Sequence, residues 1–112
     1  LMIRDRGRFN GQQVLPTGWV DASLQLTPAL TDNMAANSEY AKDPWQAYHN
    51  MWWLLDAANG EYCAVGIHGQ VIYINKSTQT VIAQFSSQPT PSQVGSVEFR
   101  SKLLAIRELA NS

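Results

Sequence analysis

Residues 61–70 (EYCAVGIHGQ) contain the strongest candidate for a chemical site in this chain. An apolar run ends at Gly66, and His68 and Gly69 follow before a second apolar run begins at Val71. A glycine inside strand-like sequence usually marks a bulge, a bend or the close approach of another group to the backbone. The imidazole of His68 is the obvious group for acid–base chemistry beside such a glycine. We therefore take the segment around Gly66 and His68 as the candidate site.

The spacing of the ligating residues argues against a metal or nucleotide site. His49 and His68 lie nineteen positions apart, with no cluster of cysteines or carboxylates near either of them. Gly66 and Gly69 match neither the GxGxxG nor the GxxxxGK[ST] pattern of a phosphate cradle. No G-x-S-x-G motif is present, and no acid is paired with a histidine as in a catalytic triad. We expect no metal ion and no other cofactor.

The serines lack the partner that lysine-assisted acyl transfer requires. Such enzymes use Ser-x-x-Lys, because one helical turn brings the lysine amine beside the serine hydroxyl. No serine of this chain has a lysine three residues later. The Tyr-x-Asn pattern that often accompanies the pair occurs twice, at residues 48–50 and 73–75, each inside an expected strand. Two chance matches in so short a chain show that this pattern is weak.

Composition predicts one domain without nucleic-acid or membrane partners. The 112 residues are 45% hydrophobic, which is enough for a single buried core. Eight basic and nine acidic side chains give a net charge of -1, without the basic stripe that binds phosphates. No segment reaches the length of about 20 apolar residues that a membrane span needs, and none resembles a signal peptide. The single cysteine, Cys63, lies in an apolar run and should be a small buried hydrophobe. We expect a cytoplasmic protein.

The first half of the chain should be poor in sheet. Residues 1–28 read as a helical and turn entry: the last turns of a helix at the start, a turn at Asn10-Gly11, and a short helix from an N-cap at Thr17 that Pro28 ends. The chain begins at Leu1 in this helix-like sequence, so we expect further sequence upstream. Residues 29–47 are polar and aperiodic, which is typical of a surface loop with at most one helical turn.

The second half should form antiparallel strands and a closing helix, which gives an α+β fold. Within residues 48–87 we predict strands at 48–55, at 61–68 continued by 70–74, and at 80–85, in meander order. Asn59-Gly60 is the expected hairpin turn between the first two. Ser96 should cap a helix over residues 96–111, which carries a 4, 3, 4 apolar stripe toward the sheet. That stripe consists of Phe99, Leu103, Ile106 and Ala110.

Several ordered segments resemble a known family. Residues 7–20 (GRFNGQQVLPTGWV), 48–55 (YHNMWWLL) and 61–89, followed by the amphipathic helix, are similar to the C-terminal part of the β-lactamase-fold (DD-peptidase-like) serine hydrolases. Within that superfamily the chain looks most like the nylon-oligomer (6-aminohexanoate-dimer) hydrolases. The resemblance implies cleavage of a linear amide or ester through an acyl-enzyme. It also implies that the nucleophile lies in an upstream part of the same enzyme, and that the isolated 112 residues are inactive.

The resemblance also assigns roles around Gly66. The family strand usually carries Lys-Thr-Gly or His-Thr-Gly, whereas residues 64–66 read Ala-Val-Gly, which argues against penicillin recognition. The backbone N–H of Ile67 is implied as a donor of the oxyanion hole, free of ladder partners within this chain. Gly66 would let the acyl group approach, and Val65 and His68 would flank the pocket.

Other side chains have weaker implied roles. Ser92, in the loop before the last helix, would approach the substrate, whereas Arg100 should be a solvated charge. Trp52 and Trp53 should point to opposite sheet faces, so at most one faces a pocket and core packing is the expected role.

Alternatives to the enzyme remain at this point. The chain could be a self-standing protein-binding module whose exposed Trp and Tyr side chains present an aromatic sheet face, or merely a stable proteolytic core. The oligomeric state, a homodimer included, is left open by the sequence.

Overall fold

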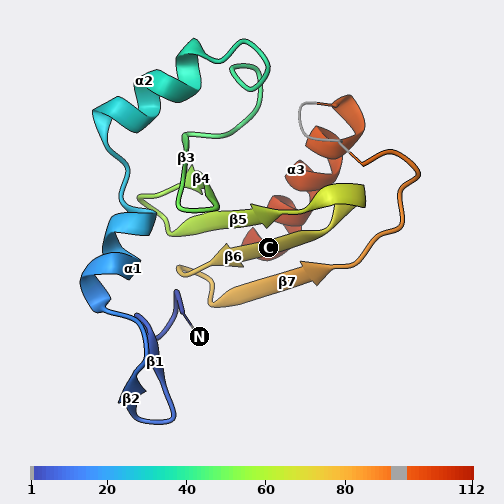
Figure 1. Cartoon of the computed structure of the whole chain (residues 1–112). Coiled ribbons are helices and arrows are strands. Elements are labelled where there is room, and N and C mark those ends of the chain that lie inside the picture. The colour runs from blue at the N-terminus through green and yellow to red at the C-terminus, as the bar shows by residue number, and fades with distance from the viewer. Residues whose placement is uncertain (1, 92–95) are drawn as a thin grey trace.

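A computed structural model describes residues 2–91 and 96–112 as an α+β arrangement with a five-stranded antiparallel sheet (Figure 1). In chain order the elements are β1 (Arg8–Phe9), β2 (Gln12–Gln13), α1 (Thr17–Leu24), α2 (Pro28–Ala36), β3 (Ala47–His49), β4 (Trp52–Asp56), β5 (Glu61–Val65), the 3₁₀ turn η1 (Ile67–Gly69), β6 (Val71–Asn75), β7 (Thr80–Gln84) and α3 (Val97–Asn111). The sheet has the order β3-β4-β5-β6-β7. The antiparallel meander and the closing helix capped by Ser96 are confirmed, since Ser96 Oγ accepts from Phe99 N at 3.1 Å.

The predicted strand over residues 48–55 is in fact two strands. β3 and β4 pair with each other, with Tyr48 opposite Trp53, and the chain turns between them at Asn50 and Met51. Both turn residues have positive φ, at 48° and 71°, as a tight hairpin requires. Asn50 is a residue type that tolerates positive φ, but no glycine follows it, so the usual Asn-Gly turn signal is absent.

The chain also reverses at residues 66–70, where the prediction had β6 continuing the line of β5. Instead β6 folds back antiparallel onto β5, with Val65 opposite Val71. His68 (φ 57°) and Gly69 (φ 83°) are consecutive left-handed residues, and together they reverse the chain. The expected glycine break is therefore a hairpin loop, called here the β5–β6 loop (residues 66–70). The hairpin at Asn59-Gly60 is confirmed by the pairing of β4 with β5.

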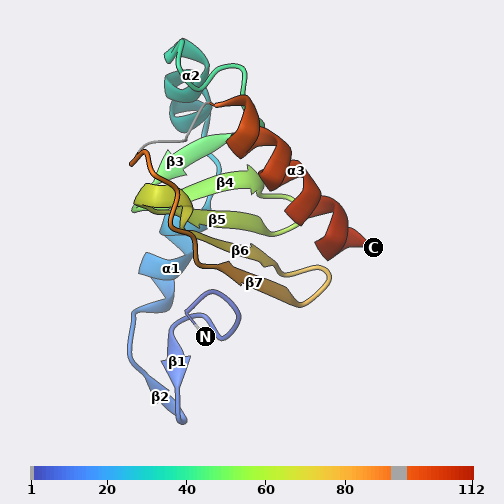
Figure 2. The same ribbon diagram turned by 90° about the vertical axis from the view of Figure 1, so that its right-hand side faces the viewer.

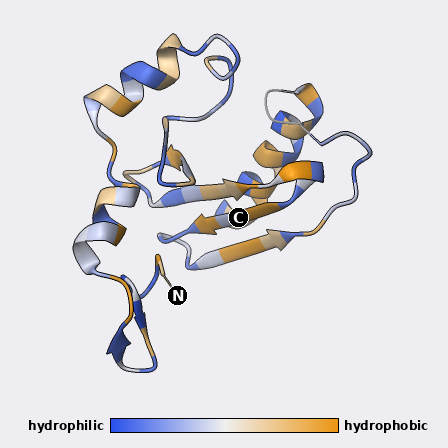
Figure 3. Cartoon of the chain, in the orientation of Figure 1, coloured by the Kyte–Doolittle hydropathy of each residue, from blue (hydrophilic) through white to orange (hydrophobic). Residues whose placement is uncertain are grey.

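The entry region differs from prediction before α1. Residues 2–7 form turns rather than the end of a helix, because Arg6 and Gly7 both have positive φ. Asn10-Gly11 closes the small β1–β2 hairpin, which extends away from the sheet and is largely hydrophilic (Figures 2 and 3). The helix expected from Thr17 is present as α1, although its N-cap is Pro16.

The loop predicted over residues 29–47 contains the helix α2. Thr27 caps it by accepting from Leu30 N at 3.4 Å, and Pro28 occupies its first turn. Proline is favoured there because the first N–H groups of a helix have no intrahelical acceptor. Pro28 therefore begins a helix rather than ending one, and Thr27-Pro28 was the missed signal.

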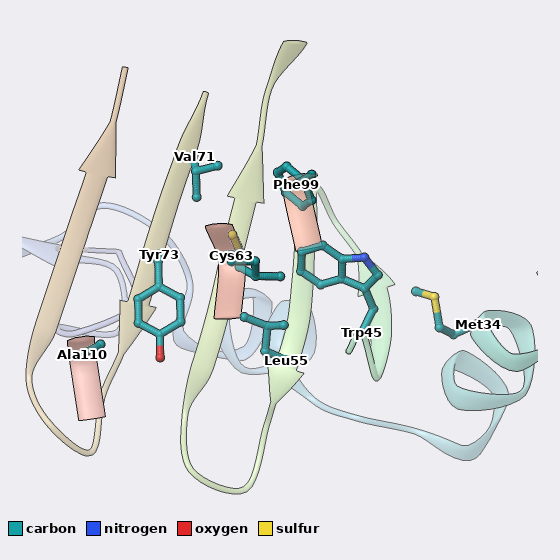
Figure 4. Close-up of a cluster of buried hydrophobic side chains, with 9 residues drawn as sticks. Met34, Trp45, Leu55, Cys63, Val71, Tyr73, Phe99 and Ala110 are labelled. Carbon is teal, nitrogen blue, oxygen red and sulfur yellow. The ribbon is translucent and has the colours of Figure 1, made fainter. Parts of the chain in front are cut away.

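The sheet separates two hydrophobic clusters. On the face covered by α3, side chains of β4, β5 and β6 pack against the helix stripe, as Figures 2 and 4 show. This cluster contains Met34, Trp45, Leu55, Cys63, Val71, Tyr73, Phe99, Leu103 and Ala110. The second cluster lies toward α1 and contains Ile3, Val20, Leu24, Ala47, Leu54 and Tyr62. The apolar stripe predicted for the last helix thus faces the sheet as expected.

Two ion pairs fasten α3 to the rest of the molecule. Arg107 Nε donates to the buried Glu61 Oε2 at 2.6 Å, and this hydrogen bond raises the pKa of Arg107. Arg100 Nε donates to Asp43 Oδ1 at 2.7 Å, and the Asp43 side chain is only 3% exposed. The expectation that Arg100 is a solvated charge is therefore wrong: the loop after α2 supplies a buried carboxylate that the sequence pattern did not reveal.

Among the helices of residues 2–91 and 96–112, none is both long and apolar enough to cross a membrane.

Two adjacent leucines of α3 provide a matched test of this packing. Leu103 is 1% exposed and Leu104 is 48% exposed. Leu103→Ala should lower the free energy of unfolding by about 2–5 kcal/mol, because it opens a cavity against the sheet. Leu104→Ala should change it by no more than about 0.5 kcal/mol. Urea unfolding of both variants measures the difference, and equal losses would contradict this placement of α3.

Candidate functional site

The β5–β6 loop stands at the end of two central strands. The pairing of β5 and β6 runs to Val65 opposite Val71, so the loop is held at both ends by sheet. The Gly66 backbone is extended, with φ -111° and ψ 169°, and the 3₁₀ turn η1 begins at the next residue. Ile67 is 67% exposed, whereas Gly69 in the same loop is buried. The 3₁₀ turn η1 thus lies at the surface and is held in place by the paired strands β5 and β6.

Two amides of this turn, those of Ile67 and Gly69, have no acceptor among the described residues, and of these two residues only Ile67 is exposed. Gly66 N donates to Gln70 O at 2.9 Å, and His68 N donates to Pro91 O at 3.0 Å. Between them, the Ile67 N–H has no acceptor among the described residues. The reason is geometric, because the first N–H of a helical turn has no preceding carbonyl within the turn to bond to. A backbone donor without an internal partner can stabilise negative charge that develops on a ligand oxygen.

The imidazole of His68 is turned toward the protein. Its Nδ1 lies 2.7 Å from Gln88 O. A carbonyl oxygen only accepts, so Nδ1 carries the hydrogen and donates it. Its backbone O accepts from Gln88 N at 3.3 Å, so His68 is bonded through its side chain and through both backbone groups.

The other predicted site residues are distributed as follows. Val65 is half-buried and packs against the α3-facing cluster. Gly66 is exposed, and a Cβ on it would lie 3.1 Å from Gln70 Cβ, a close contact on its inner side. Ser92 lies outside the described residues. Gly66, Ile67 and His68 therefore lie in the β5–β6 loop, and Val65 is the last residue of β5 before it.

Two residues of this region received no role from the sequence. The Gln70 side-chain amide pairs with Ser86, donating from Nε2 to Ser86 O and accepting from Ser86 N on Oε1 at 3.2 Å. Gln88 supplies the two backbone groups that bind His68. Gln70 is the last residue of the motif EYCAVGIHGQ. Its contact with residues after β7 could not be predicted, because residues distant in sequence leave no pattern within a local motif.

Cys63 is confirmed as a buried hydrophobe. It lies on β5 with no exposed surface, and burial raises the pKa of its thiol to about 12. The thiol is therefore neutral near pH 7 and unsuited to act as a nucleophile. Within residues 2–91 and 96–112, no three His, Cys, Asp or Glu side chains gather as a metal site would need.

The paired tryptophans point to opposite faces of the sheet, as predicted. Trp52 packs against the cluster near α1, and Trp53 against the α3-facing cluster. Trp53 also contacts Tyr48, with ring centroids 4.5 Å apart, and borders a hollow of about 200 Å³ between α2 and the β3–β4 hairpin. The lining residues of that hollow include none from the β5–β6 loop. Core packing thus accounts for most of the aromatic surface that a binding module would have used.

Hydrogen exchange of individual amides tests the bonding pattern of the loop. In this chain, Gly66 and His68 amides should be protected relative to their intrinsic exchange rates, because each has an acceptor. The Ile67 amide should exchange close to its intrinsic rate. Exchange followed by ¹⁵N NMR resolves the three residues separately, and protection of Ile67 equal to that of its neighbours would show that it has an internal acceptor.

Comparison with known proteins shows which proteins the chain resembles. No protein-family model matches the chain. It is 32% identical over 92 residues to 6-aminohexanoate-dimer hydrolase of Paenarthrobacter ureafaciens, a match that covers 80% of this chain and 22% of that protein. It also resembles the solved structure named "Putative 6-aminohexanoate-dimer hydrolase from Bacillus anthracis", with a TM-score of 0.65 and 26% identity over 97% of this chain and 26% of the other. The chain is therefore similar to 6-aminohexanoate-dimer hydrolases and spans about a quarter of the length of the two proteins that it matches.

Proposed function

We propose that this chain is the C-terminal part of a β-lactamase-fold serine hydrolase that cleaves linear amides or esters, and that its β5–β6 loop contributes an oxyanion-hole donor. The observation that carries the proposal is the unpaired Ile67 N–H, held between two paired amides on a turn fixed by sheet. The names of the relatives support an amide-cleaving hydrolase. The binding-module alternative gains nothing from either comparison.

In this proposal the reaction is shared between the chain and an upstream part of the enzyme. A serine hydroxyl there attacks the substrate carbonyl carbon, and its proton passes through a lysine and a tyrosine to the leaving group. The carbonyl oxygen becomes an oxyanion when the C–O bond to serine forms. Ile67 N–H and the N–H of the nucleophile donate to that oxygen. The leaving amine or alcohol departs with the proton, and water then hydrolyses the acyl-enzyme.

The described residues supply binding and charge stabilisation rather than a nucleophile. No serine has the required lysine, the Cys63 thiol is neutral, and His68 Nδ1 is bonded to Gln88 O. We infer that the 112 residues alone do not turn over substrate. A preorganised backbone donor contributes about 2.7–4 kcal/mol to the transition state, which is the part assigned to this loop.

The sheet offers surface for the upstream part to cover. Ile72 and Val81, on the face away from α3, are 45% and 66% exposed. β7 pairs only with β6 among the described strands, which leaves its other edge open for strand addition. Burial of this apolar face would stabilise the assembled enzyme at roughly 25 cal/mol per Å² of apolar surface.

The names of the matched proteins support the proposed small-molecule substrate. Both are named for the 6-aminohexanoate dimer. A linear amide of that kind is the class we propose for the enzyme that contains this chain, with simple esters as alternative acyl donors.

Replacing Ile67 with proline tests the oxyanion donor without removing the loop. Proline lacks the N–H, and Ile67 has neither a positive φ nor a described acceptor that would be lost. The extended Gly66, with ψ 169°, has the conformation favoured before proline. In the full-length enzyme, Ile67→Pro should lower kcat by about 10²–10³-fold, the usual effect of losing one such donor.

Ile67→Ala is the matched control, because it removes the exposed side chain and keeps the N–H. It should retain kcat within a few-fold, and thermal unfolding should show both variants folded. Hydrolysis of a linear amide and of an activated ester provides the rates. Full activity of a folded Ile67→Pro enzyme would overturn the proposed role of the loop.

A further inference from the structure

The segment after β7, residues 86–91, is bound to the β5–β6 loop by a set of hydrogen bonds that we call the loop clamp. His68 supplies three of them: its N–H donates to Pro91 O at 3.0 Å, its O accepts from Gln88 N at 3.3 Å, and its Nδ1 donates to Gln88 O at 2.7 Å. Gln70 adds two through its amide to the backbone of Ser86. In Figures 1 and 2 this segment runs beside the turn between β5 and β6.

Close packing beneath the loop leaves the clamp little freedom. A Cβ on Gly69 would lie 2.8 Å from Gln88 Oε1 and 2.9 Å from Ser86 Oγ, so the 86–91 segment touches the turn directly. Gln84 Nε2 donates to Gly69 O at 2.9 Å from the end of β7. The turn is therefore fixed on its inner side by contacts from residues that lie 15 to 23 positions later in the chain.

The clamp acts on both neighbours of the free amide. On one side, Gly66 N is fixed by Gln70 O, and the Gln70 side chain is fixed by Ser86. On the other side, His68 is fixed by Gln88 and Pro91. The peptide group that carries the Ile67 N–H lies between Gly66 and His68. The fixed positions of these two residues therefore determine the direction in which the N–H points. No described acceptor of its own determines where it points.

We propose that His68 is a positioning residue, which sets the direction of the Ile67 N–H through the loop clamp instead of touching the substrate. This inference rests on the proposed oxyanion role of Ile67. The resemblance implied that the His68 imidazole flanks the substrate pocket. In this proposal the imidazole instead supports the loop from inside the protein. Donation from Nδ1 to a carbonyl is made by both the neutral and the protonated ring, so the clamp should hold in either state.

Two substitutions at His68 separate the imidazole from the backbone. His68→Gly removes Nδ1 and tolerates the left-handed φ of 57°, so backbone strain does not confuse the result. His68→Asn keeps a side-chain donor near the position of Nδ1 and also tolerates that conformation. In the full-length enzyme His68→Gly should lower kcat by about 10- to 100-fold, because a shift of about 1 Å at a reacting group has effects of this size. KM should change little, and His68→Asn should recover much of the loss.

A double-mutant cycle with Ile67→Pro shows whether His68 acts through the amide. If it does, adding His68→Gly to Ile67→Pro should lower kcat no further, because the positioned donor is already absent. If the two losses multiply, His68 acts independently and the inference is wrong. His49→Ala is the control, because its Nδ1 also bonds a backbone carbonyl, Ala22 O at 3.1 Å, but far along the chain from the loop. It should leave kcat unchanged.

The outcomes separate this inference from the function on which it rests. An active Ile67→Pro enzyme would contradict the oxyanion role itself. A strong loss in Ile67→Pro together with unchanged kcat in a folded His68→Gly enzyme would overturn only the positioning role. A His68→Gly enzyme that loses both thermal stability and kcat, with no recovery in His68→Asn, would also count against the positioning role, since this result indicates general unfolding.

Discussion

The reversal of the chain at His68 and Gly69 is the constraint on which the rest of this structure depends. Two consecutive left-handed residues, with φ of 57° and 83°, turn β6 back along β5. A one-residue shift in that turn would move every side chain of β6 to the opposite face. Val71 and Tyr73 would then leave the buried cluster beneath α3. The turn therefore determines both the packing of the core and the place of the free amide.

The same region links the sheet to the last helix. The 86–91 segment leaves β7, is bound along the inner side of the β5–β6 loop, and leads toward α3. The helix is then held by its apolar stripe and by the pairs Arg107 with Glu61 and Arg100 with Asp43. A surface loop gains rigidity from such long-range contacts, and preorganisation is what makes a backbone donor effective in the transition state. If the loop has the proposed catalytic role, stability and catalysis depend on the same contacts.

Local patterns predicted the elements that have strong local signals. The 4, 3, 4 stripe and Ser96 located α3, and Asn59-Gly60 located one hairpin correctly. The turns at Asn50-Met51 and His68-Gly69 were not predicted, because each interrupts an apolar run that resembles a continuous strand, although Asn, His and Gly readily adopt positive φ. α2 was not predicted, because Pro28 was interpreted as the end of the preceding helix. In the structure Thr27 is the N-cap of α2 and Pro28 lies in its first turn.

The candidate site was predictable in position and less so in detail. The glycines around His68 marked the five residues that form the β5–β6 loop, and the resemblance implied a role for the backbone of Ile67. The bonds of His68 and Gln70 to residues 86–91 join positions far apart in sequence, which no spacing rule within the loop reveals. Likewise, Asp43 and Arg100 form an ion pair although they lie 57 positions apart in the sequence. Because the sequence does not reveal this partner, Arg100 was predicted to be a solvated charge.

The most direct test of the central claim is a structure of the full-length enzyme whose nucleophile has been phosphonylated. The phosphonyl oxygen stands in for the oxyanion of the acyl-transfer intermediate. The account predicts this oxygen at about 2.7–3.1 Å from the Ile67 N, with the loop clamp intact. An oxygen bound elsewhere, with the Ile67 N–H bonded to a protein acceptor, would contradict it.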